Sequence, residues 1–161
     1  MYDLSFWAED DIEEFVSKYE NRLYRTAIAI IGNKADAEDI VQDVFVKVIE
    51  KRPIFQSLEH ETAWLIRVTA NLCKSRLRSS WWKKTVPLLE SYPAQTEEQN
   101  HLMETILLLP AKYRVVIHLF YYEGYTTKEI AEMTDQKEST VRSLLTRARQ
   151  KLKSFLKEEM F

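Results

Sequence analysis

The side chains of this sequence best suited to a chemical task are bases that recur at helical spacing near its C-terminal end. Between Ser139 and Lys157 there is no Asp or Glu, and six residues are basic: Arg142, Arg147, Arg149, Lys151, Lys153 and Lys157. The formal net charge of the 161 residues is −2, so this positive charge is local. Solvated helix faces usually mix both signs of charge, whereas a one-signed basic face suits the phosphates of nucleic acid. The run therefore favours nucleic acid as a partner.

A helix-turn-helix is predicted where this basic run begins. Thr126 and Glu129 have the spacing of a capping box, which starts a helix, and a break at residues 134–137 separates it from a second helix. In this motif the second helix enters the major groove of DNA, and its early side chains meet base edges. Its buried face is predicted to consist of Val141, Leu145 and Ala148. The alternative is an ordinary helical hairpin with a basic surface, and the outward candidates for DNA contact are Thr140, Arg142, Ser143, Thr146, Arg147 and Arg149.

A second stretch without acids spans residues 62–84. Its six bases are Arg67, Lys74, Arg76, Arg78, Lys83 and Lys84. Trp81 and Trp82 lie among them, and unpaired bases of single-stranded nucleic acid stack on aromatic rings while cations follow the phosphates. Asn71 is polar near the middle of an apolar helix and is a candidate for contact with a base edge. Trp64 lies at core spacing, so we expect it to pack rather than to stack.

Seven helices are predicted to position these side chains, and few turn formers or alternating runs interrupt them. They span residues 12–31, about 34–51, 62–78, 102–109, 111–123, 126–133 and 138 onward. Asn33 is expected to cap the second helix, and residues 53–61 are expected to form a loop. The prediction is an all-α fold with two small helical domains, residues 1–80 and residues 100–161, joined by a linker at residues 81–99. The second domain contains the helix-turn-helix.

The second predicted helix has an acidic face. Its apolar face consists of Ile40, Val41, Val44, Phe45 and Val48, whereas Asp39, Gln42 and Asp43 lie on or beside the opposite one. Carboxylates repel phosphates, so this face is predicted to meet solvent or another protein and not DNA.

Several classes of function are disfavoured by what the sequence lacks. Two glycines cannot build a phosphate-binding loop, and the three histidines have no metal-ligand spacing with the single cysteine, Cys73. We therefore predict no enzyme activity, no metal and no cofactor. The N-terminal residues do not resemble a signal peptide, and no apolar run is long enough for membrane insertion. The sequence is expected to be cytoplasmic.

Three stretches of the sequence resemble bacterial sigma factors of the extracytoplasmic-function group. They are residues 36–45, residues 63–72, and residues 109–114 together with the segment 126–153. The resemblance implies that Asp39, Gln42 and Asp43 bind core RNA polymerase. It also implies that the helix with Arg67, Asn71, Lys74 and Arg78 melts and reads the minus-ten element of promoter DNA. The residues from Thr140 to Arg149 that face outward would contact the minus-thirty-five element, and an anti-sigma factor is an implied partner.

The helix-turn-helix departs from the common pattern of that group. Lys137 and Ser139 stand where many members have Pro and Gly, Gln136 replaces an apolar residue, and Leu144 replaces a frequent base. The promoter sequence is therefore expected to differ. The alternative function is a stand-alone helix-turn-helix regulator, whose N-terminal helices would sense a ligand or form a dimer.

Overall fold

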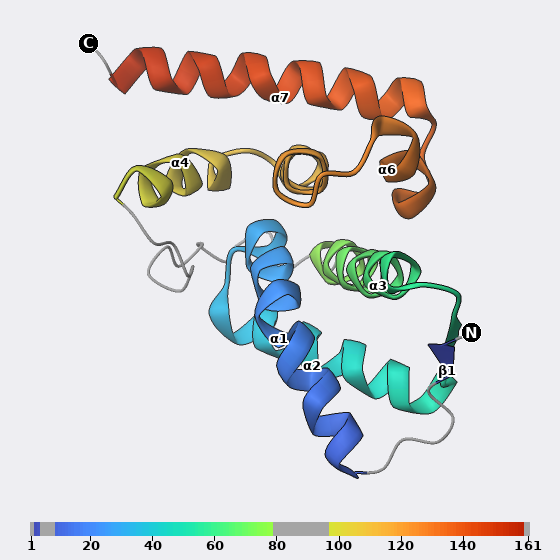
Figure 1. The fold of residues 1–161 in the computed structure, drawn as a ribbon. Helices are drawn as coiled ribbons and strands as arrows, with labels where there is room; N and C mark the ends of the chain where they lie inside the picture. The colour runs from blue at the N-terminus through green and yellow to red at the C-terminus, as the bar shows by residue number, and fades with distance from the viewer. Residues whose placement is uncertain (1, 4–8, 79–96, 160–161) are drawn as a thin grey trace.

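The computed structural model describes residues 2–3, 9–78 and 97–159 and shows an almost entirely helical chain (Figure 1). The N-terminal domain contains α1 (Glu9–Ile31), α2 (Lys34–Lys51) and α3 (Leu58–Leu77). Strands β1 (Tyr2–Asp3) and β2 (Ile54–Phe55) form a two-residue antiparallel pair. The C-terminal domain contains α4 (Glu97–Leu107), α5 (Ala111–Ile117), the π-helical segment η3 (His118–Tyr122), α6 (Thr127–Thr134) and α7 (Glu138–Glu159). The all-α prediction is confirmed.

The ends of α1 and α2 follow from local chemistry. Gly32 ends α1 with a φ of 73°, a left-handed conformation that glycine adopts without steric cost. The Asn33 side chain then accepts a hydrogen bond of 3.1 Å from the Asp36 amide, which confirms the predicted cap of α2. At the other end, Arg52 takes a left-handed conformation directly before Pro53.

The third helix begins earlier than predicted. Residues 53–61 were expected to form a loop, but α3 starts at Leu58 because the Ser57 hydroxyl accepts a hydrogen bond of 3.1 Å from the His60 amide. Glu59 and Glu61 lie in its first turn, where the helix dipole favours acids. A capping serine followed by acids is a helix-start signal, so the earlier boundary could have been read from the sequence.

Each domain has its own apolar interior. In the N-terminal domain the three helices bury Leu23, Ile28, Ile40, Leu65 and Ile66, and Phe55 from β2 is fully buried beside them. In the C-terminal domain the fully or nearly fully buried side chains are Met103, Ile106, Leu119, Ile130, Val141 and Leu145. Side chains of this size each contribute about 1.5–3 kcal/mol on burial, which is how short helices with modest propensity are held in place.

The two domains also pack against each other. Helix α1 contacts α5, and α3 contacts α6, so the helix-turn-helix lies beside the basic helix of the N-terminal domain (Figure 1). The predicted linker at residues 81–99 lies outside the described residues except for 97–99, which belong to α4. None of the helices within residues 9–78 and 97–159 has the length and apolar character needed to cross a membrane.

Candidate nucleic-acid interface

The predicted helix-turn-helix is present, with α6 and α7 as its two helices. The Thr126 hydroxyl accepts a hydrogen bond of 3.1 Å from the Glu129 amide, and the Glu129 carboxylate accepts one of 3.0 Å from the Thr126 amide. This reciprocal pair is the predicted capping box. Asp135 ends α6 with a φ of 53°, which reverses the chain direction before α7 begins at Glu138.

Helix α7 separates a buried face from a polar one. Val141, Leu145 and Ala148 are buried, as predicted. Thr140 is exposed, and a shallow hollow on the surface of α7 is lined by Ser139, Arg142, Ser143, Thr146, Arg147 and Gln150. Arg can pair with guanine through two hydrogen bonds, and Ser or Thr can serve a base or a phosphate. The arrangement is therefore suited to insertion into the major groove of DNA.

A hydrogen-bonded acid orients the first arginine of this face. One carboxylate oxygen of Glu138 accepts 2.9 Å from the Arg142 guanidinium and 3.0 Å from the Thr127 hydroxyl. The same carboxylate thus joins the start of α6 to the start of α7 and holds Arg142 one turn further along.

Two residues of α7 lie where the sequence did not suggest. Leu144 is buried, so it cannot supply the altered base contact that its replacement of a common basic residue suggested. Arg149 is exposed, but its guanidinium donates a hydrogen bond of 2.6 Å to the Tyr121 hydroxyl and lies 5.6 Å from the centre of that ring. It borders an apolar groove of about 500 Å³ between α4, η3 and α7, not the hollow that contains Arg142 and Arg147.

The basic residues of α3 form a second stripe, spaced so that they share one face. Arg67, Asn71 and Arg78 are exposed, whereas Lys74 is half-buried. Burial lowers the pKa of Lys74, the neighbouring charge of Arg78 lowers it further, and Asp135 at the end of α6 opposes both. Trp64 packs as predicted, with its ring 5.7 Å from that of Phe55. Trp81, Trp82, Lys83 and Lys84 lie outside the described residues.

The acidic surface of α2 is open. Asp39, Gln42 and Asp43 are all exposed, while the apolar residues on the other side of the helix are buried or half-buried. Asp36 and Asp39 each lie 3.7 Å from the Arg76 guanidinium of α3. Burial raises the pKa of Asp36, and Arg76 acts against that shift. The link between the acidic helix and the basic helix was not foreseen, because no spacing rule relates positions on different helices.

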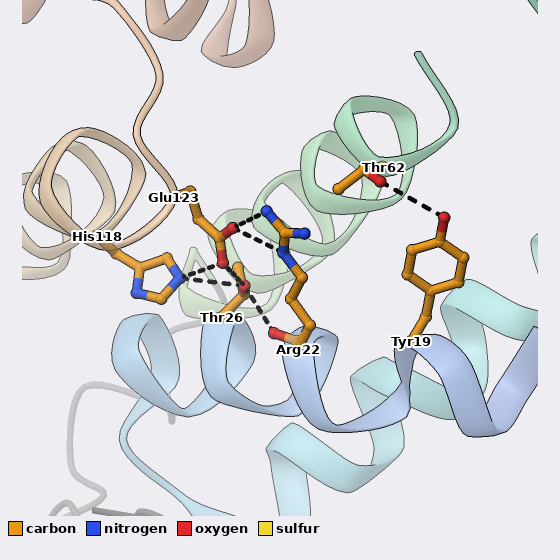
Figure 2. A network of polar contacts seen from close by, with 6 residues as sticks. All are labelled: Tyr19, Arg22, Thr26, Thr62, His118 and Glu123. Atoms are coloured by element: carbon orange, nitrogen blue, oxygen red, sulfur yellow. Dashed lines mark hydrogen bonds and ion pairs between the residues drawn. The ribbon is translucent and has the colours of Figure 1, made fainter. Parts of the chain in front are cut away.

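A buried polar network between the domains was also missed (Figure 2). Glu123 follows η3, and its carboxylate lies 2.7 Å from the Arg22 guanidinium, 3.3 Å from the Thr26 hydroxyl and 3.3 Å from His118 Nε2. His118 Nε2 also lies 3.1 Å from the Thr26 hydroxyl. The partners are about a hundred positions apart in the sequence, so only folding brings them together.

Neither remaining reactive group forms a catalytic site. Cys73 is fully buried, and burial raises the pKa of its thiol, which makes it a poor nucleophile. In the part of the chain that the structure describes, no three His, Cys, Asp or Glu side chains are grouped to hold a metal ion.

Comparison with known proteins identifies the class. Residues 15–83 match sigma-70 region 2, and residues 99–152 match sigma-70 region 4. The ECF RNA polymerase sigma factor SigE of Mycolicibacterium smegmatis is 31% identical over 157 residues, which are 89% of this chain and 61% of that protein. The ECF RNA polymerase sigma factor SigW of Bacillus subtilis is 27% identical over 173 residues, with 93% and 91% covered. The chain thus belongs to the sigma-70 family, in its extracytoplasmic-function (ECF) group.

Solved structures share the fold. The sigma factor RpoE from Bartonella quintana, in complex with the anti-sigma factor NepR, has a TM-score of 0.73 at 24% identity and covers 92% of this chain and 98% of its own. CnrH, in complex with the cytosolic domain of CnrY, has a TM-score of 0.64 at 22% identity, with 94% and 90% covered.

Proposed function

We propose that this protein is a promoter-specificity subunit that binds core RNA polymerase and directs it to promoters, without catalysing a reaction itself. Its proposed partners are core RNA polymerase and promoter DNA, which place its action in the cytoplasm. An anti-sigma factor is a further proposed partner, because RpoE and CnrH are both sigma factors seen with a protein that binds them.

The observation that carries this proposal is the placement of three polar surfaces on three helices. The exposed acidic surface of α2 is proposed to bind core polymerase through Asp39, Gln42 and Asp43. The stripe on α3 is proposed to contact the minus-ten element through Arg67, Asn71, Lys74 and Arg78. The face of α7 is proposed to contact the minus-thirty-five element through Thr140, Arg142, Ser143, Thr146 and Arg147.

Arg149 was predicted as a minus-thirty-five contact as well. Its hydrogen bond to Tyr121 supports a weaker role in DNA binding than that of Arg142 or Arg147, because DNA contact would have to compete with an interaction already made. Phosphate contact from the edge of the site is the role that we propose for it.

Run-off transcription tests the proposal. Core RNA polymerase with this protein should initiate at a promoter found by sequencing transcripts after its overproduction, and core enzyme alone should not. The lone protein should give little specific gel shift with the same duplex at physiological salt. A stand-alone regulator would give a tight, specific shift without polymerase, and failure to bind core enzyme would reject the proposed function. Family membership across both domains already disfavours that regulator.

A further inference from the structure

The network around Glu123 has the character of a clasp between the two domains. Its carboxylate is almost inaccessible to solvent and receives Arg22 Nε at 2.9 Å as well as the second guanidinium nitrogen at 2.7 Å, a two-pronged contact from the N-terminal domain (Figure 2). Burial by itself would raise the pKa of Glu123, but hydrogen bonds and charge from His118 and Arg22 outweigh it and hold this pKa below its ordinary value. The carboxylate is therefore charged and paired across the domain boundary.

A second contact closes the interface next to it. Arg114 of α5 is buried, and its guanidinium donates to the Ile30 carbonyl at the end of α1 and, at 2.7 Å, to the Leu109 carbonyl. Burial lowers its pKa to about 10, which leaves it charged at neutral pH. Carbonyls in the last turn of a helix lack partners within it and carry partial negative charge, so Arg114 complements the C-terminal end of α1. We name Arg22, Thr26, Arg114, His118 and Glu123 the interdomain clasp.

The clasp covers part of the surface proposed to read DNA. Helix α6 packs on α3, and Asp135 at its end lies near enough to Lys74 to act on its charge. Lys74 shares its face of α3 with Arg67, Asn71 and Arg78, so a strand that followed this stripe would meet α6 and a carboxylate. Contact along the whole stripe requires α6 to move away.

The spacing of the two proposed contact surfaces leads to the same requirement. Packed helices lie about 8–10 Å apart, and the four residues from Asp135 to Ser139 reach at most about 14 Å, so the stripe on α3 and the start of the α7 face are within roughly 25 Å. Elements centred about 25 base pairs apart, as minus ten and minus thirty-five are, lie about 85 Å apart on B-form DNA at about 3.4 Å per pair. The described arrangement cannot contact both elements of one promoter.

We infer that the described arrangement is a self-masked state, held shut by the interdomain clasp, and that opening it limits promoter use by this chain without any added inhibitor. This inference rests on the proposed function for the two DNA surfaces. When only a fraction of a protein is binding-competent, the apparent affinity is reduced by that fraction. A weakened clasp therefore increases promoter use, although it removes interactions from the chain.

Charge exchange across the clasp tests the inference directly in the free, full-length protein. Arg22→Glu places two acids together and Glu123→Arg places two bases together, whereas the double variant restores an opposite pair. Arg25→Glu is the matched control, because Arg25 is exposed on the same helix and makes none of the clasp contacts. Labels on Glu20→Cys and Ser154→Cys, both exposed, report the distance between the domains, since buried Cys73 remains unlabelled.

Each single exchange is expected to lengthen the distance between labels, the double variant to recover part of the change, and Arg25→Glu to leave it unaltered. Circular dichroism melting shows whether each variant is folded. A folded Glu123→Arg protein with the parental distance overturns the inference, and so does a parental protein whose domains are already apart in solution.

The second readout is the protein concentration that gives half-maximal run-off transcription with core polymerase. We expect this concentration to fall by about tenfold in each single exchange, within the usual range of coupling between two states, and to return toward the parental value in the double variant. If the parental protein supports transcription but the opened variants need as much protein or more, the masking role is wrong and the proposed function stands. If no variant supports transcription and the distances still change, the proposed function is wrong and the clasp remains a structural contact.

Discussion

Helices α7 and α3 both carry a basic, acid-free face, yet the fold presents these faces differently. Arg142, Ser143 and Thr146 line an open hollow on α7. On α3, Lys74 is half-buried beside α6 and Asp135. Charge pattern alone makes the two helices equivalent readers of DNA, whereas packing leaves one ready and the other partly covered. The comparison teaches that a basic stripe marks a DNA surface but does not tell in which conformation that surface is available.

The largest effect is expected from breaking the support of the open face. Leu145→Ala removes a nearly fully buried side chain below α7 and should cost about 2–5 kcal/mol of folding free energy. Hydrogen exchange should then show lost protection in α5–α7, with α1–α3 largely retained because they have a separate core.

Ser143→Ala, on the exposed side of α7, is the matched control for that experiment and should change stability by no more than about 0.5 kcal/mol. Equal loss of protection in both domains after Leu145→Ala would mean that the chain unfolds as one unit.

Arg147→Ala sharpens the comparison within α7 itself. Its loss should cost about 1–3 kcal/mol at one position of the minus-thirty-five element if it reads a base. Arg149→Ala should cost less and show no preference for position, because its guanidinium is held at Tyr121. Run-off transcription from promoters changed one base pair at a time measures both. A uniform loss with Arg147→Ala would instead identify a phosphate contact.

Asp43→Arg tests the third polar surface, which neither DNA face should affect. Reversing an exposed charge at a protein interface should weaken binding to core polymerase by about 1–2 kcal/mol, mostly through slower association, with the fold unchanged. Surface plasmon resonance with immobilised core enzyme measures this, and Glu50→Arg, exposed further along α2, is the control. Unchanged affinity would remove Asp43 from the proposed core-binding surface.

The smallest effect concerns pH and the covered face. The folded-state pKa of Glu123 is lowered, so its contribution to the closed arrangement is complete above its ordinary value of 4.5 and is lost as the pH falls through the lowered value. The label distance should therefore increase on acidification below about pH 4.5 in the parental protein. Glu123→Gln, which cannot lose this charge, should show a flatter response, and identical curves would assign the change to other carboxylates.

Much of the architecture could be predicted because its causes are local. Asn33, Thr126 and Glu129 cap helices through hydrogen bonds to residues three positions away, and these caps formed as predicted. The buried face of α7 followed from helical periodicity. The start of α3 was missed by four residues, since the capping role of Ser57 was overlooked.

The sequence by itself therefore determined the helices, their caps, their apolar faces and the motifs of a two-domain sigma factor, because these depend on neighbours within a turn or two. Only the tertiary structure decided that Leu144 is buried, that Arg149 meets Tyr121, and that Lys74 lies under α6. It alone joined Arg22 to Glu123 across the domain boundary. Such contacts arise from the packing of surfaces distant in the chain, and no spacing of residues encodes them.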